Sequence, residues 1–305
     1  MSQLKKYHGI IPAFYACYDA NGEISPQTVR DLTQYFIDKG VQGLYVNGSS
    51  GECIYQSVED RKIILENVMA VAKGKLTIIA HVACNSSKES QILAAHAESL
   101  GVDAIAAIPS IYFRLPEYAI ADYWNEISAA APHTDFVIYN IPQLAGVALT
   151  PSLYREMLKN ERVVGVKNSS MPVQDIQTFA SIAGPEKIVF NGPDEQFLAG
   201  RLMGAAGGIG GTYGAMPELF LCLNQLIENK ELERAKDLQY AINDIIAKLC
   251  SCHGHMYAVI KAVLKINEGL ELGGVRSPLS NLIESDLATV EEAATLIRAT
   301  KETFL

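Results

Sequence analysis

The sequence predicts an α/β fold, a (β/α)₈ TIM barrel followed by a C-terminal helical extension. Eight short apolar runs alternate with longer segments of helical period, and no strand-like run follows the eighth. Most of these runs are apolar throughout, as expected of parallel strands that are buried on both faces. The predicted strands are Ile10–Phe14, Gly43–Val46, Leu76–Val82, Ala104–Ile108, Phe136–Tyr139, Val163–Val166, Ile188–Phe190 and Gly207–Gly210.

Local signals mark the ends of the helices between these strands. Ser25 is a favourable N-cap residue, Pro26 follows it at the first helical position, and Gly40 ends the same segment. Ser86 and Glu89 have the spacing of a capping box at the start of another helix. Because a parallel strand needs a crossover to reach the next one, these segments predict eight successive βα units.

The end of the chain is predicted to be entirely helical. We divide the chain into a barrel at residues 1–215, which would carry the active site, and a helical extension at residues 216–305. The main alternative is an open, doubly wound sheet, but Ile10–Asp19 lacks the Gly-x-Gly-x-x-Gly turn of that fold. The predicted helices of the extension are Pro217–Asn229, Glu231–Leu249, Met256–Glu268 and Val290–Thr303.

The composition limits the class of protein. The chain has 305 residues, of which 49% are hydrophobic and 19% charged, so it can bury a large core and is not intrinsically disordered. Its net charge of −9 disfavours an extended nucleic-acid surface, although one local positive site could hold a small anion. We expect neither a signal peptide nor a membrane span, because no suitable apolar run is present.

The cysteines and histidines predict neither a disulfide framework nor a metal site. The six cysteines lack a disulfide spacing, so we expect reduced, buried thiols in a cytoplasmic protein. The segment Cys250–His255 contains residue types that bind metals but lacks the paired spacing of a zinc site. His81 lies inside a predicted strand, and we interpret it as a hydrogen-bonded core histidine rather than a general base.

Two reactive side chains stand at the ends of neighbouring predicted strands, where the chemistry of such barrels belongs. Lys167 directly follows the sixth strand, where partial desolvation would favour the neutral amine that attacks a carbonyl. Tyr139 ends the fifth strand and could transfer a proton beside that amine. Each also has an ordinary interpretation, because lysine and tyrosine at strand ends often only reach towards water.

Three other strand ends carry polar or glycine-rich segments. Ser49 and Ser50 stand between two glycines, a pattern that can form a nest of N–H groups and hydroxyls for a carboxylate. Asp194 and Glu195 could accept hydrogen bonds from substrate hydroxyls, or they could only favour the start of a helix. The glycines of Gly207–Gly211 are typical of a phosphate site in a barrel, which favours a phosphosugar isomerase as a different class.

Taken together, these segments resemble one superfamily, that of N-acetylneuraminate lyase and dihydrodipicolinate synthase. The similarity spans residues 1–215 in register, and the helical tail agrees in kind. The lyase branch is the more similar one, through Leu44–Glu52, Tyr139–Val147 and Asn191–Glu195. The synthase branch has an arginine that binds a second carboxylate where Leu144 stands here, and leucine cannot donate a hydrogen bond.

The resemblance implies a role for each candidate residue. Lys167 would form an imine with a 2-keto acid, and Tyr139 would relay a proton during cleavage of the carbon–carbon bond. Ser49 and Ser50 would bind the carboxylate, with Ser50 in place of the usual threonine. The other substrate-binding residues would be Ser169, Gly192, Asp194, Glu195, Gly211 and Tyr112.

Two of these positions differ from the residue that lyases usually have, and a third is expected at a subunit interface. Ser169 stands where lyases usually have threonine, and it keeps the hydroxyl. Gly211 stands where lyases commonly have a serine for the distal sugar chain, and a lost neutral hydrogen bond costs about 0.5–1.5 kcal/mol. Tyr112 matches a tyrosine at a subunit interface of relatives, so the resemblance implies a homotetramer, with a dimer as the alternative.

The function implied by the resemblance is that of a class I aldolase. It would cleave N-acetylneuraminate reversibly to N-acetylmannosamine and pyruvate. Because the imine serves as the electron sink, the reaction needs no metal and no cofactor. The partners would be a 2-keto sugar acid and pyruvate, not nucleic acid or a membrane. The alternatives are a pyruvate-condensing synthase of the dihydrodipicolinate type, an aldolase for another sugar acid, the phosphosugar isomerase, and a non-catalytic sugar-acid sensor.

Overall fold

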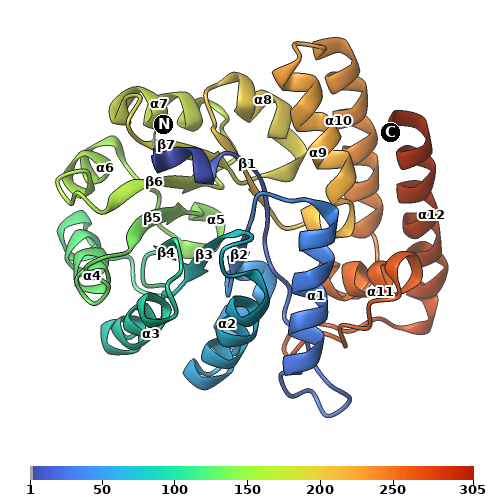
Figure 1. Cartoon of the computed structure of the whole chain (residues 1–305), viewed down its shortest axis with the longest axis horizontal. Helices are drawn as coiled ribbons and strands as arrows, with labels where there is room; N and C mark the ends of the chain where they lie inside the picture. The colour runs from blue at the N-terminus through green and yellow to red at the C-terminus, as the bar shows by residue number, and fades with distance from the viewer. Residues whose placement is uncertain (1–2) are drawn as a thin grey trace.

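The computed structural model describes residues 3–305, so the first two residues of the predicted barrel segment lie outside it. Eight parallel strands form one sheet in the order β1-β8-β7-β6-β5-β4-β3-β2. A parallel bridge between Ala13 and Tyr45 joins the ends of that order, so the sheet closes into the predicted barrel (Figure 1). The strands are β1 (Gly9–Pro12), β2 (Gly43–Val46), β3 (Thr77–His81), β4 (Ala104–Ala107), β5 (Asp135–Asn140), β6 (Val163–Asn168), β7 (Ile188–Asn191) and β8 (Gly207–Gly210).

Three strands, β5, β6 and β7, run further than the sequence predicted. β5 and β6 continue to Asn140 and Asn168, whose buried side chains pair through a hydrogen bond of 2.7 Å from Asn140 Nδ2 to Asn168 Oδ1. The Asn140 oxygen also accepts from the Leu149 amide, and Asn168 Nδ2 donates to the Ser170 hydroxyl. Because these buried amides all have partners, the two polar residues extend the strands instead of ending them. Tyr139 and Lys167 therefore lie inside the strands, one residue before each end.

Helices cover the outside of the barrel (Figure 1). Ser25 caps the first of them, and Gly40 ends it with a left-handed backbone at φ 75°. The capping box predicted at Ser86 and Glu89 is half formed. The Ser86 side chain accepts a hydrogen bond from the Glu89 amide, but the exposed Glu89 side chain does not accept one from the Ser86 amide. The helices are α1 (Pro26–Lys39), α2 (Val58–Ala72), α3 (Ser87–Leu100), α4 (Glu117–Ala129), α5 (Pro142–Ala145), α6 (Pro151–Met157), α7 (Gln174–Ala183) and α8 (Phe197–Leu202).

The inside of the barrel is a second, smaller core. Its buried side chains come from the strands and from the N-terminal segment, and Tyr139 belongs to it. Gly165 has no space for a side chain, because a Cβ there would lie 2.0 Å from the backbone oxygen of Ile188. The backbones of β6 and β7 therefore approach closely at Gly165, two residues before Lys167 on the same strand. The core residues are Tyr7, Ile11, Tyr45, Ile79, Ala104, Ala106, Val137, Tyr139, Val164, Ile188, Phe190 and Ile209.

The last helices pack together on one side of the barrel (Figure 1). α9 packs against β1, and α12 packs against α9, α10 and α11. Lys39 of α1 and Lys301 of α12 both form ion pairs with Glu218 and Glu268, which fastens this group of helices to the barrel. The division at residue 215 stays a prediction. The helices are α9 (Pro217–Glu228), α10 (Leu232–Leu249), α11 (Met256–Glu268) and α12 (Leu287–Phe304).

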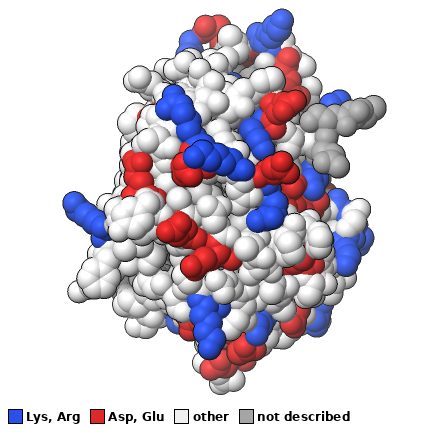
Figure 2. Space-filling view, turned by 90° about the vertical axis from the view of Figure 1, so that its left-hand side faces the viewer, with Lys and Arg blue, Asp and Glu red and all other residues white. Residues whose placement is uncertain are grey.

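Basic and acidic side chains are interspersed on the face shown in Figure 2. Among residues 3–305, none of the helices is long and apolar enough to cross a membrane. All six cysteines are free, but the prediction that they are buried is wrong for most of them. Cys17 is buried, whereas Cys250 is exposed because it ends α10 at a surface turn.

Candidate active site

A cavity of about 330 Å³ lies at the carboxyl ends of the strands. Side chains from the ends of β2, β5, β6, β7 and β8 converge on it. Of the ten predicted site residues, Tyr112 does not line the cavity. The other nine do, and they are Lys167, Tyr139, Ser49, Ser50, Ser169, Gly192, Asp194, Glu195 and Gly211.

The Lys167 amine lies between two aromatic rings. Tyr139 and Lys167 are register partners on β5 and β6. The Lys167 nitrogen lies 3.9 Å from the centre of the Tyr139 ring and 4.3 Å from the centre of the Tyr45 ring. Only 5% of the Lys167 residue is exposed. Two ring faces attract a positive charge at this nitrogen, whether it belongs to an ammonium or to a protonated imine.

His81 packs beside this group without a charge of its own. Burial lowers the pKa of His81 well below its usual value, and the nearby Arg61 guanidinium acts in the same direction. The imidazole is therefore neutral, with Nδ1 3.0 Å from the backbone oxygen of Asn47 and its ring perpendicular to that of Tyr139. This supports the interpretation of His81 as a core histidine, and it adds no second positive charge beside Lys167.

The turn after β2 is held in an uncommon backbone conformation. Ser49–Gly51 form a short 3₁₀ turn between Asn47 at φ 61° and Glu52 at φ 57°. Left-handed backbone at non-glycine residues persists only where the surroundings enforce it. Here Asn47 is fixed by donation from Nδ2 to the backbone oxygen of Arg61 at 2.8 Å. The turn thus presents Ser49 and Ser50 to the cavity in a fixed position.

Asp194 is the most perturbed acid of the cavity. Its Oδ2 accepts hydrogen bonds from the amide and the hydroxyl of Thr212, at 2.7 and 2.6 Å. Its buried Oδ1 accepts none from the residues that the structure describes. Burial raises the pKa of Asp194 to about 7, although the bonds from Thr212 oppose the shift. An unpartnered carboxylate oxygen on a residue that lines a cavity is a candidate acceptor for a hydroxyl group.

Two glycines of the cavity make room for their neighbours. A Cβ at Gly192 would lie 2.0 Å from the Ser169 hydroxyl oxygen, so a side chain there would displace that hydroxyl. A Cβ at Gly211 would lie 3.1 Å from Ser50 Oγ and 3.3 Å from the Tyr257 hydroxyl oxygen. Tyr257 therefore occupies much of the space beside residue 211.

Tyr257 belongs to a group of cavity residues that sequence reasoning missed. Ile246 of α10 and Met256 and Tyr257 of α11 line the cavity, although they come from the helical end of the chain. The Ser50 hydroxyl donates a hydrogen bond of 3.0 Å to the Tyr257 hydroxyl. Neither spacing nor composition marks these residues, because their position depends on how α10 and α11 pack on the barrel.

Two sequence features lie outside the cavity. Tyr112 is 89% exposed, has φ 86° and packs its ring against Phe113. Cys250–His255 forms the turn between α10 and α11, in which the amides of His253 and Gly254 donate to Asp286 and the His255 side chain caps α11. Within residues 3–305, no cluster of three metal-binding side chains occurs.

The arrangement combines a nearly buried amine, a phenol and two hydroxyls around one cavity. Such an amine can add to a carbonyl carbon, and the phenol can transfer protons beside it. The turn with Ser49 and Ser50 can bind an adjacent carboxylate, while Asp194 and Glu195 can accept hydrogen bonds from hydroxyl groups. The cavity fits the chemistry of a small polyhydroxylated keto acid.

Known proteins show the same architecture. The sequence model of the dihydrodipicolinate synthetase family matches residues 6–297. The chain is 70% identical to the N-acetylneuraminate lyase of Mediterraneibacter gnavus, over 100% of this chain and 97% of that protein. The wild-type sialic acid aldolase of Ruminococcus gnavus is 70% identical with a TM-score of 0.98, covering 98% of this chain and 100% of the other. Its catalytic lysine mutant has a TM-score of 0.99 at 69% identity, with complete coverage of both chains.

Proposed function

Because this chain belongs to the dihydrodipicolinate synthetase family, we propose that it cleaves N-acetylneuraminate reversibly to N-acetylmannosamine and pyruvate. It is a carbon–carbon lyase of the Schiff-base type, with Lys167 as the amine that captures the keto acid. The nearly buried Lys167 nitrogen between the rings of Tyr139 and Tyr45 is the observation that carries the proposal.

The reaction begins with addition of the Lys167 amine to the C2 carbonyl of the open-chain sugar acid. Loss of water gives a protonated imine, which accepts the electron pair when the C3–C4 bond breaks. The hydroxyl on C4 becomes the aldehyde of N-acetylmannosamine as its proton passes to the Tyr139 oxygen, while the phenol gives up its own proton in the same relay, so that one proton in total is available for C3 of the enamine. The remaining enamine takes up a proton at C3, and hydrolysis of the imine then releases pyruvate. The imine itself is the electron sink, so the protein needs only to position it.

The two ends of the substrate bind to opposite sides of the cavity in this proposal. The carboxylate binds at the turn that carries Ser49 and Ser50, next to the imine carbon. The hydroxyls of the sugar chain bind to Asp194 and Glu195, with Asp194 Oδ1 as one acceptor. Gly192 leaves space for the Ser169 hydroxyl, and Gly211 offers no side chain to the distal end of the sugar.

Trapping of the imine tests the proposal. Reduction with borohydride in the presence of pyruvate should leave a lasting adduct on Lys167, located by mass spectrometry of peptides. Lys261 is a matched control, because it is also buried but is bound to Glu52. Lys167→Ala should abolish both the adduct and pyruvate release. An unmodified Lys167 in the native protein would reject the Schiff-base reaction.

The structure offers less to the alternative functions. Leu144 lines the cavity where a synthase would need a donor for a second carboxylate, so aspartate semialdehyde should not be condensed with pyruvate. The β8 glycines face protein groups. A Cβ at Gly208 would lie 2.1 Å from the Tyr213 hydroxyl oxygen, and a Cβ at Gly210 would lie 2.1 Å from Asp194 Oδ1. These glycines therefore make room for Tyr213 and Asp194 rather than for a phosphate.

Assembly and location are part of the proposal. We infer a homotetramer with Tyr112 and Phe113 at a subunit interface, because two adjacent rings that are 89% and 73% exposed form an unusual surface feature. Sedimentation of the native protein and of a Tyr112→Asp variant tests this inference, and equal mass for both would contradict it. We also propose a cytoplasmic protein, and two segments at residues 1–215 and 216–305.

A further inference from the structure

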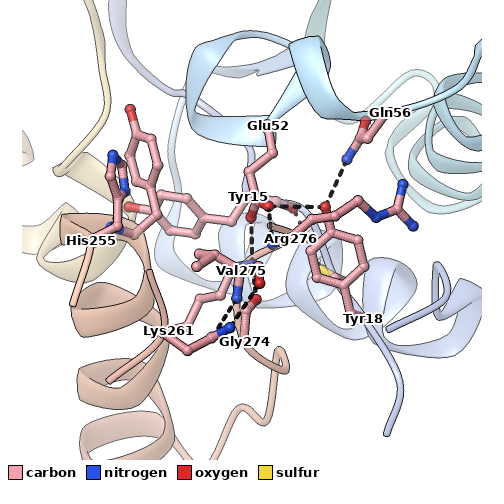
Figure 3. Close-up of polar contacts among 12 residues, drawn as sticks. Tyr15, Tyr18, Glu52, Gln56, His255, Lys261, Gly274, Val275 and Arg276 are labelled. Atoms are coloured by element: carbon pink, nitrogen blue, oxygen red, sulfur yellow. Dashed lines mark hydrogen bonds and ion pairs between the residues drawn. The ribbon is translucent and has the colours of Figure 1, made fainter. Parts of the chain in front are cut away.

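α11 contacts the turn after β2 through two side chains that lie one helical turn apart. Tyr257 and Lys261 are separated by four residues, so they project from the same side of α11. Tyr257 accepts a hydrogen bond from Ser50 of the turn. Lys261 forms an ion pair with Glu52, which ends the turn, at 2.8 Å (Figure 3). One face of a C-terminal helix thus holds two positions of the segment that presents the serine hydroxyls.

The ion pair between Glu52 and Lys261 is completely enclosed. The Glu52 side chain is 0% exposed and that of Lys261 is 1% exposed. Glu52 Oε2 accepts bonds from the Tyr18 hydroxyl at 3.0 Å and from the Arg276 amide at 2.8 Å. Lys261 also donates to the backbone oxygen of Gly274 at 2.6 Å (Figure 3). Every group of this network has a partner, so a shift of the Glu52 side chain would leave buried charges unpaired.

The network fixes the backbone of the turn as well as the Glu52 side chain. Glu52 holds a left-handed backbone at φ 57°, and its amide donates to the Ser49 oxygen at 3.0 Å to close the turn. A non-glycine residue keeps that conformation only if its surroundings outweigh the strain. The buried ion pair with Lys261 is one such restraint at Glu52, which follows Ser50 by two residues in the same turn.

We propose that Lys261 is a positioning residue for the keto-acid carboxylate, and that it acts through Glu52 on the turn that carries Ser49 and Ser50. The inference rests on the proposed function, because it assigns a binding role to that turn. Lys261 does not touch the substrate in this proposal. Its effect should therefore appear in the affinity for the carboxylate and not in the reactivity of Lys167.

The test uses a variant that removes both charges. Lys261→Met alone would leave Glu52 buried and unpaired, which threatens folding. In Glu52→Gln/Lys261→Met both partners are neutral, and the glutamine oxygen can still accept from Tyr18 and Arg276. The pyruvate concentration for half-maximal borohydride trapping should rise about tenfold, the effect of weakening one charged hydrogen bond. The maximal extent of trapping at Lys167 should stay near that of the native protein.

Acetone separates positioning from general damage, because it has a methyl group where pyruvate has its carboxylate. Its trapping at Lys167 should change by less than about twofold in the double variant. Lys39→Met is the matched control, since Lys39 also ties the barrel to the C-terminal helices while Lys301 still pairs with both of its acids. That variant should lower Tm slightly and leave half-saturation by pyruvate unchanged.

Several outcomes would overturn the inference. A folded double variant with native half-saturation by pyruvate would show that Lys261 has no role in binding. If trapping of pyruvate and trapping of acetone weakened equally in the double variant, the change would lie at Lys167 or in the fold and not in carboxylate binding. If the double variant does not fold, Glu52→Gln alone keeps a side-chain oxygen that can accept from Lys261. This single variant should raise half-saturation severalfold, and no change there would be decisive against the role. Failure of the native protein to trap pyruvate would instead reject the proposed function.

Discussion

Tyr139 and Lys167 stand opposite each other on neighbouring strands, and the Lys167 nitrogen lies over the Tyr139 ring, 3.9 Å from its centre. The contact gives one residue two possible functions. The ring face stabilises a cation at the nitrogen, whereas the hydroxyl can transfer a proton. Phenylalanine keeps the first property and lacks the second, so the two can be measured separately.

Tyr139→Phe should therefore stop cleavage without stopping capture. We expect kcat for N-acetylneuraminate to fall roughly a hundredfold or more, which is the usual contribution of a positioned general acid–base group. Trapping of pyruvate by borohydride at Lys167 should remain near native, because the ring face is still present. A kcat close to that of the native protein would assign the proton transfer to another group.

The Tyr45 ring provides a second test of the cation site. Tyr45→Leu removes the face that lies 4.3 Å from the Lys167 nitrogen, so imine formation with pyruvate should weaken by about tenfold at most. Tyr45→Phe should be nearly neutral, since the Tyr45 hydroxyl has no partner among the described residues. The measurement is the pyruvate concentration for half-maximal trapping.

Tyr154 offers the control for lost packing. It is fully buried and packs its ring against Phe179, on the outer side of the barrel wall. Tyr154→Leu should lower Tm and leave trapping of pyruvate unaltered. If both leucine variants weaken trapping equally, the effect comes from packing and not from the ring face at Lys167.

Gly211→Ser should be unfavourable while Tyr257 is present. The new Cβ would lie 3.1 Å from Ser50 Oγ and 3.3 Å from the Tyr257 hydroxyl oxygen, so both groups must shift. We expect a severalfold rise in KM for N-acetylneuraminate. Tyr257→Phe removes one of the two contacts, and the double variant should be less impaired than the product of the single effects. Strictly multiplicative KM changes would show that residues 211 and 257 are independent.

Asp194 predicts a specific pH dependence of stability. Burial raises its folded-state pKa to about 7, above the value of the unfolded chain, so its contribution to stability is largest in acid and is lost as the pH rises through 7. Relative to Asp194→Asn, the free energy of unfolding should fall by about 1.4 kcal/mol per pH unit between pH 5 and pH 7. Denaturant unfolding of both proteins at equal concentration checks this, and parallel pH curves would contradict it.

The sequence could predict the barrel because the barrel depends on local pattern. The apolar runs predicted all eight strands and placed Lys167 and Tyr139 at neighbouring strand ends. The reactive roles of these two residues stay a prediction that rests on the family resemblance. The ends of β5 and β6 were misjudged, because asparagine is typical of turns. Only the structure shows that Asn140 and Asn168 bond to each other and to nearby groups inside the sheet.

The contribution of the C-terminal helices could not be predicted for a different reason. Tyr257 and Lys261 lie on an ordinary amphipathic helix, and nothing in their spacing indicates which part of the barrel they contact. Their partners Ser50 and Glu52 precede them by 207 and 209 residues. Contacts of such long range arise from the path of the whole chain, which no local pattern encodes.

That separation matters while the protein is being synthesised. A ribosome releases the eight strands and the reactive lysine first, and α11 leaves the exit tunnel only near the end of translation. Until then the Glu52 carboxylate lacks the ammonium group with which it pairs in the folded chain. A chain that ended before α11 would therefore keep Lys167 but lack Tyr257 and Lys261, the two side chains through which that helix contacts the turn after β2.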